Sequence, residues 1–307
     1  MRAFLFWFLA INFGFAGAAG GNPAAQFEYK GLCEASGAAA LDDHHFAVAS
    51  DETNVILVYR RGSTDAVGRL DVEPFTTFDK SDIEAAARIG SRIYWISSHS
   101  FNKSGVDRAK RKLLFATDII AGSGAPKLRE AGSPFTGLRD ALTGAAGVSA
   151  AKLNIEGLAA TESGGLLIAL RGPLVNNEAV VVPFENPADV INGSATPRFG
   201  QVIRLKLDGL GIRSIDRVGS GNRRYLLSAG PEKDGEGPFR LFWWSGRADD
   251  LEPSEVKDID IAGIKPEALI SFDSPAGIYA LSDDDDICSD EGPVAQRRFR
   301  VKELIIP

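Results

Sequence analysis

Polar and charged residues recur through the chain as pairs with a nearly constant spacing. In five successive segments, the two members of a pair lie 15 to 17 positions apart. The pairs are Ser36 and Asp51, Glu84 and His99, Glu156 and Arg171, Arg213 and Gly230, and Glu267 and Asp283. If one member enters the first strand of an antiparallel hairpin and the other leaves the second strand, both lie at the same end of the sheet. The spacing therefore predicts a shared site that contains three glutamates and two arginines.

These charges need partners, because a buried carboxylate is costly unless it is paired or bound to a metal. In one arrangement, Glu84, Glu156 and Glu267 pair with Arg171 and Arg213 in a closed network. In a second arrangement, the carboxylates bind a hard cation such as Ca²⁺, which prefers oxygen ligands. A third interpretation is that the glutamates only fix the packing of the sheets.

A run of four aspartates, 283–286, begins at the last of the paired positions. Consecutive carboxylates repel one another unless they are solvated or bound to a metal. The candidate metal ligands are therefore Glu84, Glu156, Glu267, Asp283 and Asp284, with Ca²⁺ as the expected ion. A solvated loop is the alternative interpretation of the aspartate run.

The same positions suggest roles in ligand binding or catalysis. Arginines grip anionic groups, and the candidate ligand-binding residues are Ser36, Asp51, Arg171, Arg213 and Glu267. In a hydrolase, Glu84, Glu156 or His99 would act as the base, while Arg171 and Arg213 would stabilise developing negative charge. A structural role for His99 is the alternative. The sequence contains no nucleophile elbow, phosphate-binding loop or dinucleotide fingerprint.

Each repeat reads as strand, tight turn and strand, followed by a third strand. The turns contain Asp42-Asp43, Gly90-Ser91, Gly164-Gly165, Gly219-Ser220-Gly221 and Ser274-Pro275, which are typical turn residues. The expected third strands cover 55–59, 112–117, 201–205, 239–244 and 299–304. Repeats of small antiparallel sheets at this spacing predict an all-β fold, a β-propeller.

Five motifs favour five blades and leave six open, because a degenerate blade could occupy the gap between 118 and 154. We interpret that gap as a short inserted helix near 135–152, which is rich in alanine and leucine. A propeller must join its first and last blades to avoid open sheet edges. The strand 26–30 is expected to complete the last blade, which would bring Cys33 next to Cys288. A disulfide between them is the prediction, and two buried free thiols are the alternative.

The first residues resemble a secretory signal peptide. Arg2 precedes an apolar stretch, and Ala16-Gly17-Ala18 offers a small-residue cleavage site. Residues 1–18 are thus the expected signal peptide and 19–307 a single propeller domain, periplasmic or secreted. An uncleaved anchor is the alternative.

The net charge of −7 argues against binding to nucleic acid or to an anionic membrane surface. No second apolar run is long enough to span a bilayer. A small-molecule ligand is expected, and whether the protein has a protein partner is left open by the sequence.

The repeats also resemble an uncharacterised bacterial family, the domain-of-unknown-function 3616 family. The resemblance lies in segments 36–38, 82–85, 94–100, 155–159, 170–173, 211–213, 229–231 and 266–269, and covers most of the chain after the signal peptide. Its most specific parts are Ser97-Ser98-His99-Ser100 and Leu170-Arg171-Gly172-Pro173. The resemblance implies a propeller-like fold and implies no reaction. The layout is also loosely similar to phytase-like propellers, which use Ca²⁺ to bind phosphate esters.

Three functions remain open at this level. The first is an exported propeller that binds a small anionic or glycan-like ligand, with Ca²⁺ as a potential mediator, at a central Glu/Arg rim. The second is a metal-assisted hydrolase of phosphate or carboxylic esters. The third is a scaffold for protein interactions.

Overall fold

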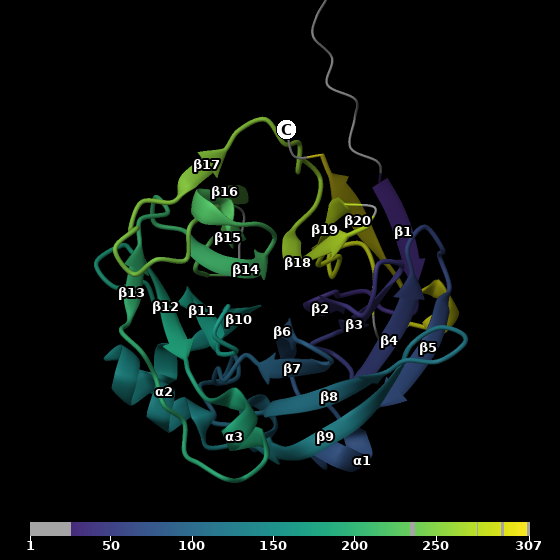
Figure 1. Ribbon diagram of the computed structural model, residues 1–307, viewed down its shortest axis with the longest axis horizontal. Helices are drawn as coiled ribbons and strands as arrows, with labels where there is room; N and C mark the ends of the chain where they lie inside the picture. The colour runs from purple at the N-terminus through teal and green to yellow at the C-terminus, as the bar shows by residue number, and fades with distance from the viewer. Residues whose placement is uncertain (1–25, 234–236, 275, 290–291, 306–307) are drawn as a thin grey trace, which may run out of the picture.

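The computed structural model describes residues 26–233, 237–274, 276–289 and 292–305. The expected signal peptide, 1–18, lies outside the described residues. Each sequence repeat forms a four-stranded antiparallel sheet, and the five sheets stand around a central channel with their first strands innermost (Figure 1). This arrangement confirms the prediction of an all-β propeller with five blades.

The blades follow one another along the chain. Blade 1 contains β2 (Gly37–Ala40), β3 (His45–Ala49), β4 (Val55–Arg60) and β5 (Ala66–Asp71). Blade 2 contains β6 (Ile83–Ile89), β7 (Arg92–Ser97), β8 (Leu114–Ile120) and β9 (Lys127–Phe135). Blade 3 contains β10 (Asn154–Ala160), β11 (Leu166–Gly172), β12 (Ala179–Phe184) and β13 (Ile203–Leu205). Blade 4 contains β14 (Gly211–Arg217), β15 (Tyr225–Gly230), β16 (Arg240–Trp244) and β17 (Ser254–Val256).

The fifth blade joins the two ends of the chain. It contains β18 (Pro266–Asp273), β19 (Ala276–Ser282), β20 (Arg298–Leu304) and β1 (Gln26–Lys30). Strand β1 pairs antiparallel with β20, so the expected closing strand is confirmed residue for residue. Cys33 and Cys288 form the predicted disulfide, with their Cα atoms 5.4 Å apart.

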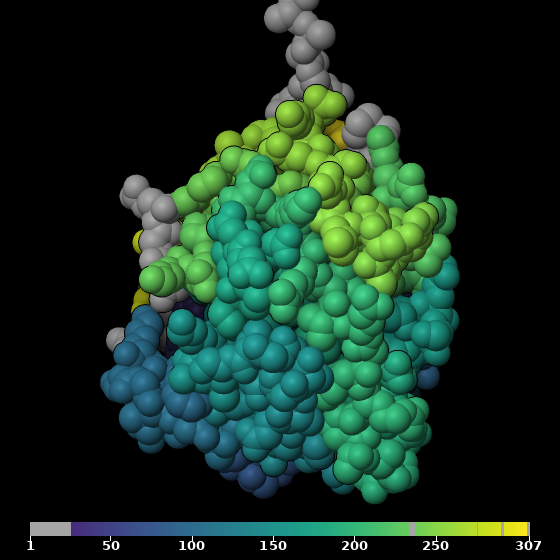
Figure 2. All heavy atoms as spheres, turned by 90° about the vertical axis from the view of Figure 1, so that its left-hand side faces the viewer, coloured from purple at the N-terminus to yellow at the C-terminus, as the bar shows by residue number. Residues whose placement is uncertain are grey.

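The hydrophobic core lies between the blades. Five clusters of buried apolar side chains fill the five blade-to-blade interfaces. Strands whose two faces are both covered read as nearly continuous apolar runs, which explains why the second strand of each repeat contains few polar residues. Atoms of neighbouring blades adjoin one another along the side of the molecule (Figure 2).

Two expectations about elements need correction. The third strand of blade 3 is β12, and the expected third strand 201–205 corresponds to β13, the fourth strand. The inserted helix α2 (Leu138–Ala146) is shorter than 135–152, because Phe135 ends β9 and Gly147 adopts a left-handed conformation, φ 66°, that ends the helix. The gap therefore holds a fourth strand and a helix.

Short helices decorate the connections between strands. They are α1 (Glu73–Thr76), α3 (Pro187–Ile191), η1 (Ala109–Arg111), η2 (Ala150–Lys152), η3 (Gly221–Arg223) and η4 (Val294–Gln296). At one end of the channel, the inner hairpins turn within a few residues. At the opposite end, which we call the rim, the connections are longer, and α1, α2, η1, η2 and η4 lie there. Variable loops on a rigid scaffold are where binding sites are usually found.

Candidate functional site

A β-bulge is repeated in four of the inner strands, at the rim. The register of β6, β10, β14 and β18 with the neighbouring strand shifts at one residue near the start of each. The residues passed over are Glu84, Glu156, Arg213 and Glu267. A bulge leaves an extra residue unpaired and can re-aim its side chain. The recurrence of this bulge explains how one backbone device presents a charged residue from each of four blades.

Four of the predicted residues form one ion-pair network, composed of Glu156, Arg171, Arg213 and Glu267. Arg171 Nη1 lies 3.0 Å from Glu156 Oε1, and Arg213 Nε lies 2.8 Å from Glu156 Oε2. Arg213 Nη2 contacts Glu267 Oε1 in the next blade. All four side chains are at most 10% exposed. The two positive and two negative charges of these four residues balance.

The space around Arg213 is formed by small and flat residues. The Phe239 ring lies 5.5 Å from the Arg213 guanidinium carbon. A Cβ atom at Gly230 would stand 2.9 Å from the Phe239 ring and 3.1 Å from Arg213 Cγ. The glycine at the predicted rim position of blade 4 therefore leaves room for this stacked pair.

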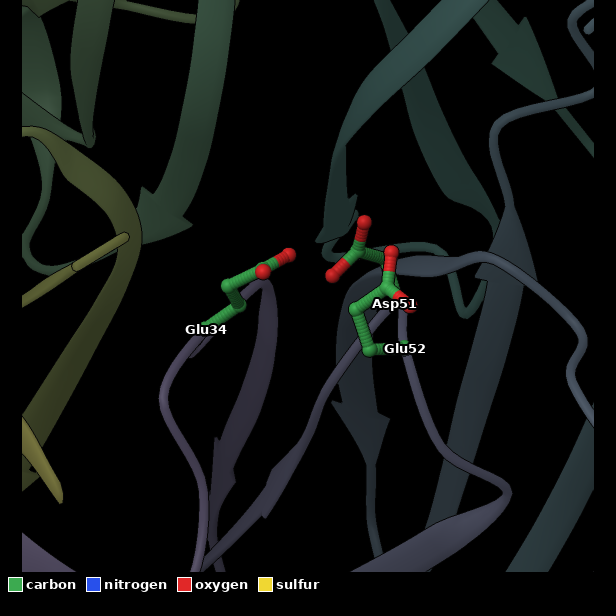
Figure 3. Close-up of side chains that lie close together, drawn as sticks. All are labelled: Glu34, Asp51 and Glu52. Atoms are coloured by element: carbon green, nitrogen blue, oxygen red, sulfur yellow. The ribbon is translucent and has the colours of Figure 1, made fainter. Parts of the chain in front are cut away.

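Five acidic residues of blades 1 and 2 form a second group, the carboxylate cluster: Glu34, Asp51, Glu52, Asp82 and Glu84. One ligand oxygen each from Glu34, Asp51 and Glu52 lies within 4.8 Å of the others, and the same holds for Asp51, Asp82 and Glu84. Figure 3 shows the first three, with carboxylates that point toward one another between the loop before β2 and the end of β3. Asp51 belongs to both sets, so its carboxylate lies at the centre of the cluster.

Only part of this negative charge is compensated. Arg111 Nη2 lies 2.6 Å from Asp82 Oδ1, and Lys80 contacts Glu52. Ser98 donates a hydrogen bond to Asp82. Asp51 Oδ1 is buried and receives no hydrogen bond from the described residues. Five carboxylates and two cationic side chains leave an excess of three negative charges if all are ionised.

Burial and the excess negative charge raise the pKa values of three carboxyl groups in the cluster. Burial, followed by a hydrogen bond with Asp51 and repulsion from it, raises the pKa of Glu34 to about 10. Burial, followed by the charges of Asp82 and Asp51, holds the pKa of Glu84 well above its usual range. Burial also raises the pKa of Asp82 to about 6, although Arg111 opposes the shift. A proton or a cation is therefore favoured between these carboxylates.

Asp82 and His99 adopt an uncommon backbone conformation. Both have φ near 55°, in the left-handed region that residues other than glycine seldom occupy. Ser98 N donates to Asp82 O at 3.0 Å, so the two strained residues lie next to each other at the ends of β6 and β7. Such strain persists where the surroundings enforce it and is often found at functional sites.

The other predicted residues lie in different settings. His99 is fully buried, and burial together with the charge of Arg139 lowers its pKa to about 3. Asp283 forms a β-bridge with Glu34, and burial raises its pKa to about 6. Asp284 lies 2.5 Å from Arg300, deep in blade 5. Ser36 is buried beside β2, where its N–H donates to Ala49 O at 3.2 Å.

Among the described residues, only Glu84 of the predicted metal ligands belongs to either set of three carboxylates. The residues that the spacing argument missed are Glu34, Glu52 and Asp82. Asp82 lies in the connection before β6, so strand periodicity gives no signal for it. Glu34 follows the disulfide cysteine, and Glu52 follows Asp51, so each adjoins a residue that was singled out.

The raised pKa values predict an unusual pH dependence of stability. A folded-state pKa above the unfolded value means that the folded protein binds the proton more tightly, so this contribution to stability is complete below pH 4.5 and is lost as the pH rises toward 10. In EDTA, we expect the melting temperature to fall by several degrees between pH 6 and pH 9. The Glu34→Gln variant should show a smaller fall, and an unchanged wild-type melting temperature across this range would contradict the assignment.

Comparison with solved structures finds chains of similar fold at low sequence identity. The chain is similar to the glutaminyl cyclase of Myxococcus xanthus, with 12% identity, a TM-score of 0.49, and coverage of 93% of this chain and 100% of that one. It is similar to the PQQ-bound aldose sugar dehydrogenase of Streptomyces coelicolor, with 10% identity, a TM-score of 0.46, and coverage of 92% and 99%. It is also similar to a gluconolactonase of Xanthomonas campestris, with 13% identity, a TM-score of 0.41, and coverage of 84% and 73%. No curated protein matches the sequence.

A family model gives the more specific match. It covers residues 149–283, which include the four residues of the ion-pair network, blades 3 and 4, and strands β18 and β19 of blade 5. Over these residues, the chain matches the family described as protein of unknown function DUF3616, which bears out the resemblance for this part of the chain.

Proposed function

We propose that this protein is an exported propeller that binds Ca²⁺ at the carboxylate cluster and, through the bound cation, a small anionic or glycan-like ligand at the rim. The observation that carries the proposal is the shared position of Asp51 in two sets of three carboxylates, with a buried oxygen that receives no hydrogen bond from the described residues. Carboxylate oxygens in such sets are the ligands that Ca²⁺ prefers.

The distribution of charge explains why the cation would have to bind before an anionic ligand. Arg171 and Arg213 are already compensated by Glu156 and Glu267, so the ion-pair network offers no net positive charge to an anion. The carboxylate cluster beside it repels anions as long as its charge is uncompensated. A divalent cation would reverse this repulsion and supply open coordination positions for carboxylate, phosphate or vicinal hydroxyl oxygens.

Export is supported by one feature besides the N-terminal sequence. The Cys33–Cys288 disulfide is of a kind that persists in oxidising compartments. No helix among the described residues is long and apolar enough to cross a membrane.

Thermal unfolding tests the cation site. After treatment with EDTA, Ca²⁺ at about 100 times its Kd should stabilise the protein by about 2.7 kcal/mol, which raises the Tm by roughly 4–5 °C for a domain of this size. Asp51→Asn should abolish the shift, whereas Asp65→Asn, which changes an exposed carboxylate of the same blade, should retain it. Equal shifts in the two variants, or no shift in the wild type, would exclude the cluster as a Ca²⁺ site.

The hydrolase alternative is favoured by one observation, the membership of Asp51 in both sets of three carboxylates, which would allow it to bridge two cations. Paired metal ions clamp the attacking and leaving oxygens in many phosphoesterases. A panel of aryl phosphates and carboxylic esters, assayed with Ca²⁺ and with EDTA, separates the two functions. Calcium-dependent turnover that is lost in Glu84→Gln would identify an enzyme. Saturable ligand binding without turnover would identify a binding protein, and neither result in the presence of bound Ca²⁺ would favour the scaffold.

A further inference from the structure

The end of the channel opposite the rim opens into a large cavity. Its volume is about 1030 Å³, and all five blades contribute to its wall through the far ends of their inner strands. Pockets that hold small ligands usually measure roughly 300–1,000 Å³. Three inner strands contribute small side chains to the wall, those of Ala40, Ala86 and Ala160, which leave space in the cavity. Leu269 and Trp243 add apolar surface.

The wall also contains a carboxylate, Asp216, that has hydrogen bonds with Ser271 and Arg217 but no ion pair among the described residues. Asp216 of β14 is partly buried, and its Oδ2 accepts a hydrogen bond of 2.7 Å from Ser271 N of β18. No cationic side chain among the described residues pairs with it. Glu156, Glu267 and Asp284, by contrast, each contact an arginine. Burial raises the pKa of Asp216 to about 6, in keeping with a charge that has no opposite partner.

The two arginines of the wall are engaged elsewhere. Arg88 donates hydrogen bonds to the carbonyl oxygens of Ala40, Leu41 and Gly90. Arg217 pairs with Glu162, 3.2 Å away. The wall further contains Asp42, Asp43, Asp273 and Glu303. Glu303 is paired with Arg61, 3.3 Å away. The lining residues still carry an excess of negative charge, and Asp216 is the carboxylate that lies on the inner strand β14.

We propose that this cavity binds a small organic ammonium ion, with Asp216 as the counter-ion and the alanine-lined wall around the apolar part of the ligand. A bare metal ion fits less well, because Ca²⁺ requires several oxygen ligands and Asp216 belongs to no set of three candidate ligands among the described residues. A neutral sugar would leave the carboxylate uncompensated. This site is separate from the proposed Ca²⁺ site, because Asp216 and Glu84 lie at opposite ends of the channel strands.

A matched pair of probes tests the proposal. In isothermal titration calorimetry and saturation-transfer NMR, butylamine and benzylamine should bind saturably at pH 7.5, and butanol and benzyl alcohol at least tenfold more weakly. Asp216→Asn should weaken amine binding at least tenfold. Asp273→Asn, at the exposed end of β18, should change it less than threefold. Ala86→Leu should also weaken binding by filling the cavity, which provides a second test if Asp216→Asn does not fold.

The outcomes distinguish this site from the rim. Glu84→Gln should leave amine binding unchanged, and Asp216→Asn should leave the Ca²⁺-induced rise in Tm unchanged. Absence of saturable binding by both amines, equal affinity for amines and alcohols, or full binding by Asp216→Asn and Ala86→Leu would each overturn the proposal.

Discussion

Replacement of Arg213 by methionine is expected to destabilise the protein by about 3–5 kcal/mol, the usual cost of removing one partner from a buried charge network. Arg213 contacts Glu156 in one neighbouring blade and Glu267 in the other, and its side chain is 8% exposed. Methionine would keep much of the apolar volume but leave two buried carboxylates without this cation. Urea unfolding followed by circular dichroism measures the change.

Arg217 supplies the matched control, because it lies on the same strand, is 38% exposed, and pairs with Glu162. Exposed ion pairs contribute about 1 kcal/mol or less, so Arg217→Met should have a small effect. Adding Glu267→Gln to Arg213→Met should recover part of the loss. Similar losses in the two arginine variants would show that the network contributes no more than a surface pair.

Removal of the disulfide should have a comparable effect by a different route. The bond joins residues separated by 255 positions, so it greatly restricts the unfolded chain. The chain-entropy model gives about 5 kcal/mol for a loop of this length, and removal of native disulfides usually costs about 2–5 kcal/mol. We expect the Cys33→Ala/Cys288→Ala variant to lose stability in this range while the native sheet content is retained, because β1 still pairs with β20.

The corresponding serine variant separates the effect of losing the disulfide from the effect of placing a polar group in its buried surroundings. Cys33 is fully buried, so a serine there adds the cost of an enclosed hydroxyl, whereas alanine does not. Both variants should also bind Ca²⁺ more weakly, since Glu34 directly follows Cys33 and Asp284 N donates to Cys33 O. Wild-type stability in the alanine variant would contradict this account of ring closure.

The fold could be predicted from the sequence because each blade repeats the same local pattern. Apolar second strands, turn residues and a constant spacing locate the five hairpins, and the need to pair the last sheet edge locates β1. The disulfide then follows from closure. The prediction of the third strand of blade 3 is wrong because the segment between β11 and β13 contains both β12 and α3. An apolar run indicates a strand but does not show whether it is the third or the fourth strand of its sheet.

The site could be predicted only in part. Spacing within a repeat shows at which end of its sheet a residue lies, but it does not show which residues of the adjacent blade lie beside it. Arg171 and Glu156 belong to one hairpin, and their contact follows from the spacing. The proximity of Asp51 to Asp82 and Glu84 joins two blades and depends on how the sheets are packed. Glu34 and Asp82 lie in connections between blades, where periodicity gives no signal. Asp284 was grouped with the rim residues, yet it pairs with Arg300 within its own blade.

Calorimetric titration of Ca²⁺ into EDTA-treated, buffer-exchanged protein tests the central claim most directly. The wild type should bind Ca²⁺ saturably, with Asp51→Asn and Glu84→Gln each weakening the affinity at least tenfold and Asp65→Asn leaving it within twofold. Heat of dilution alone in the wild type, or identical isotherms for Asp51→Asn and Asp65→Asn, would contradict the assignment of the carboxylate cluster as a cation site.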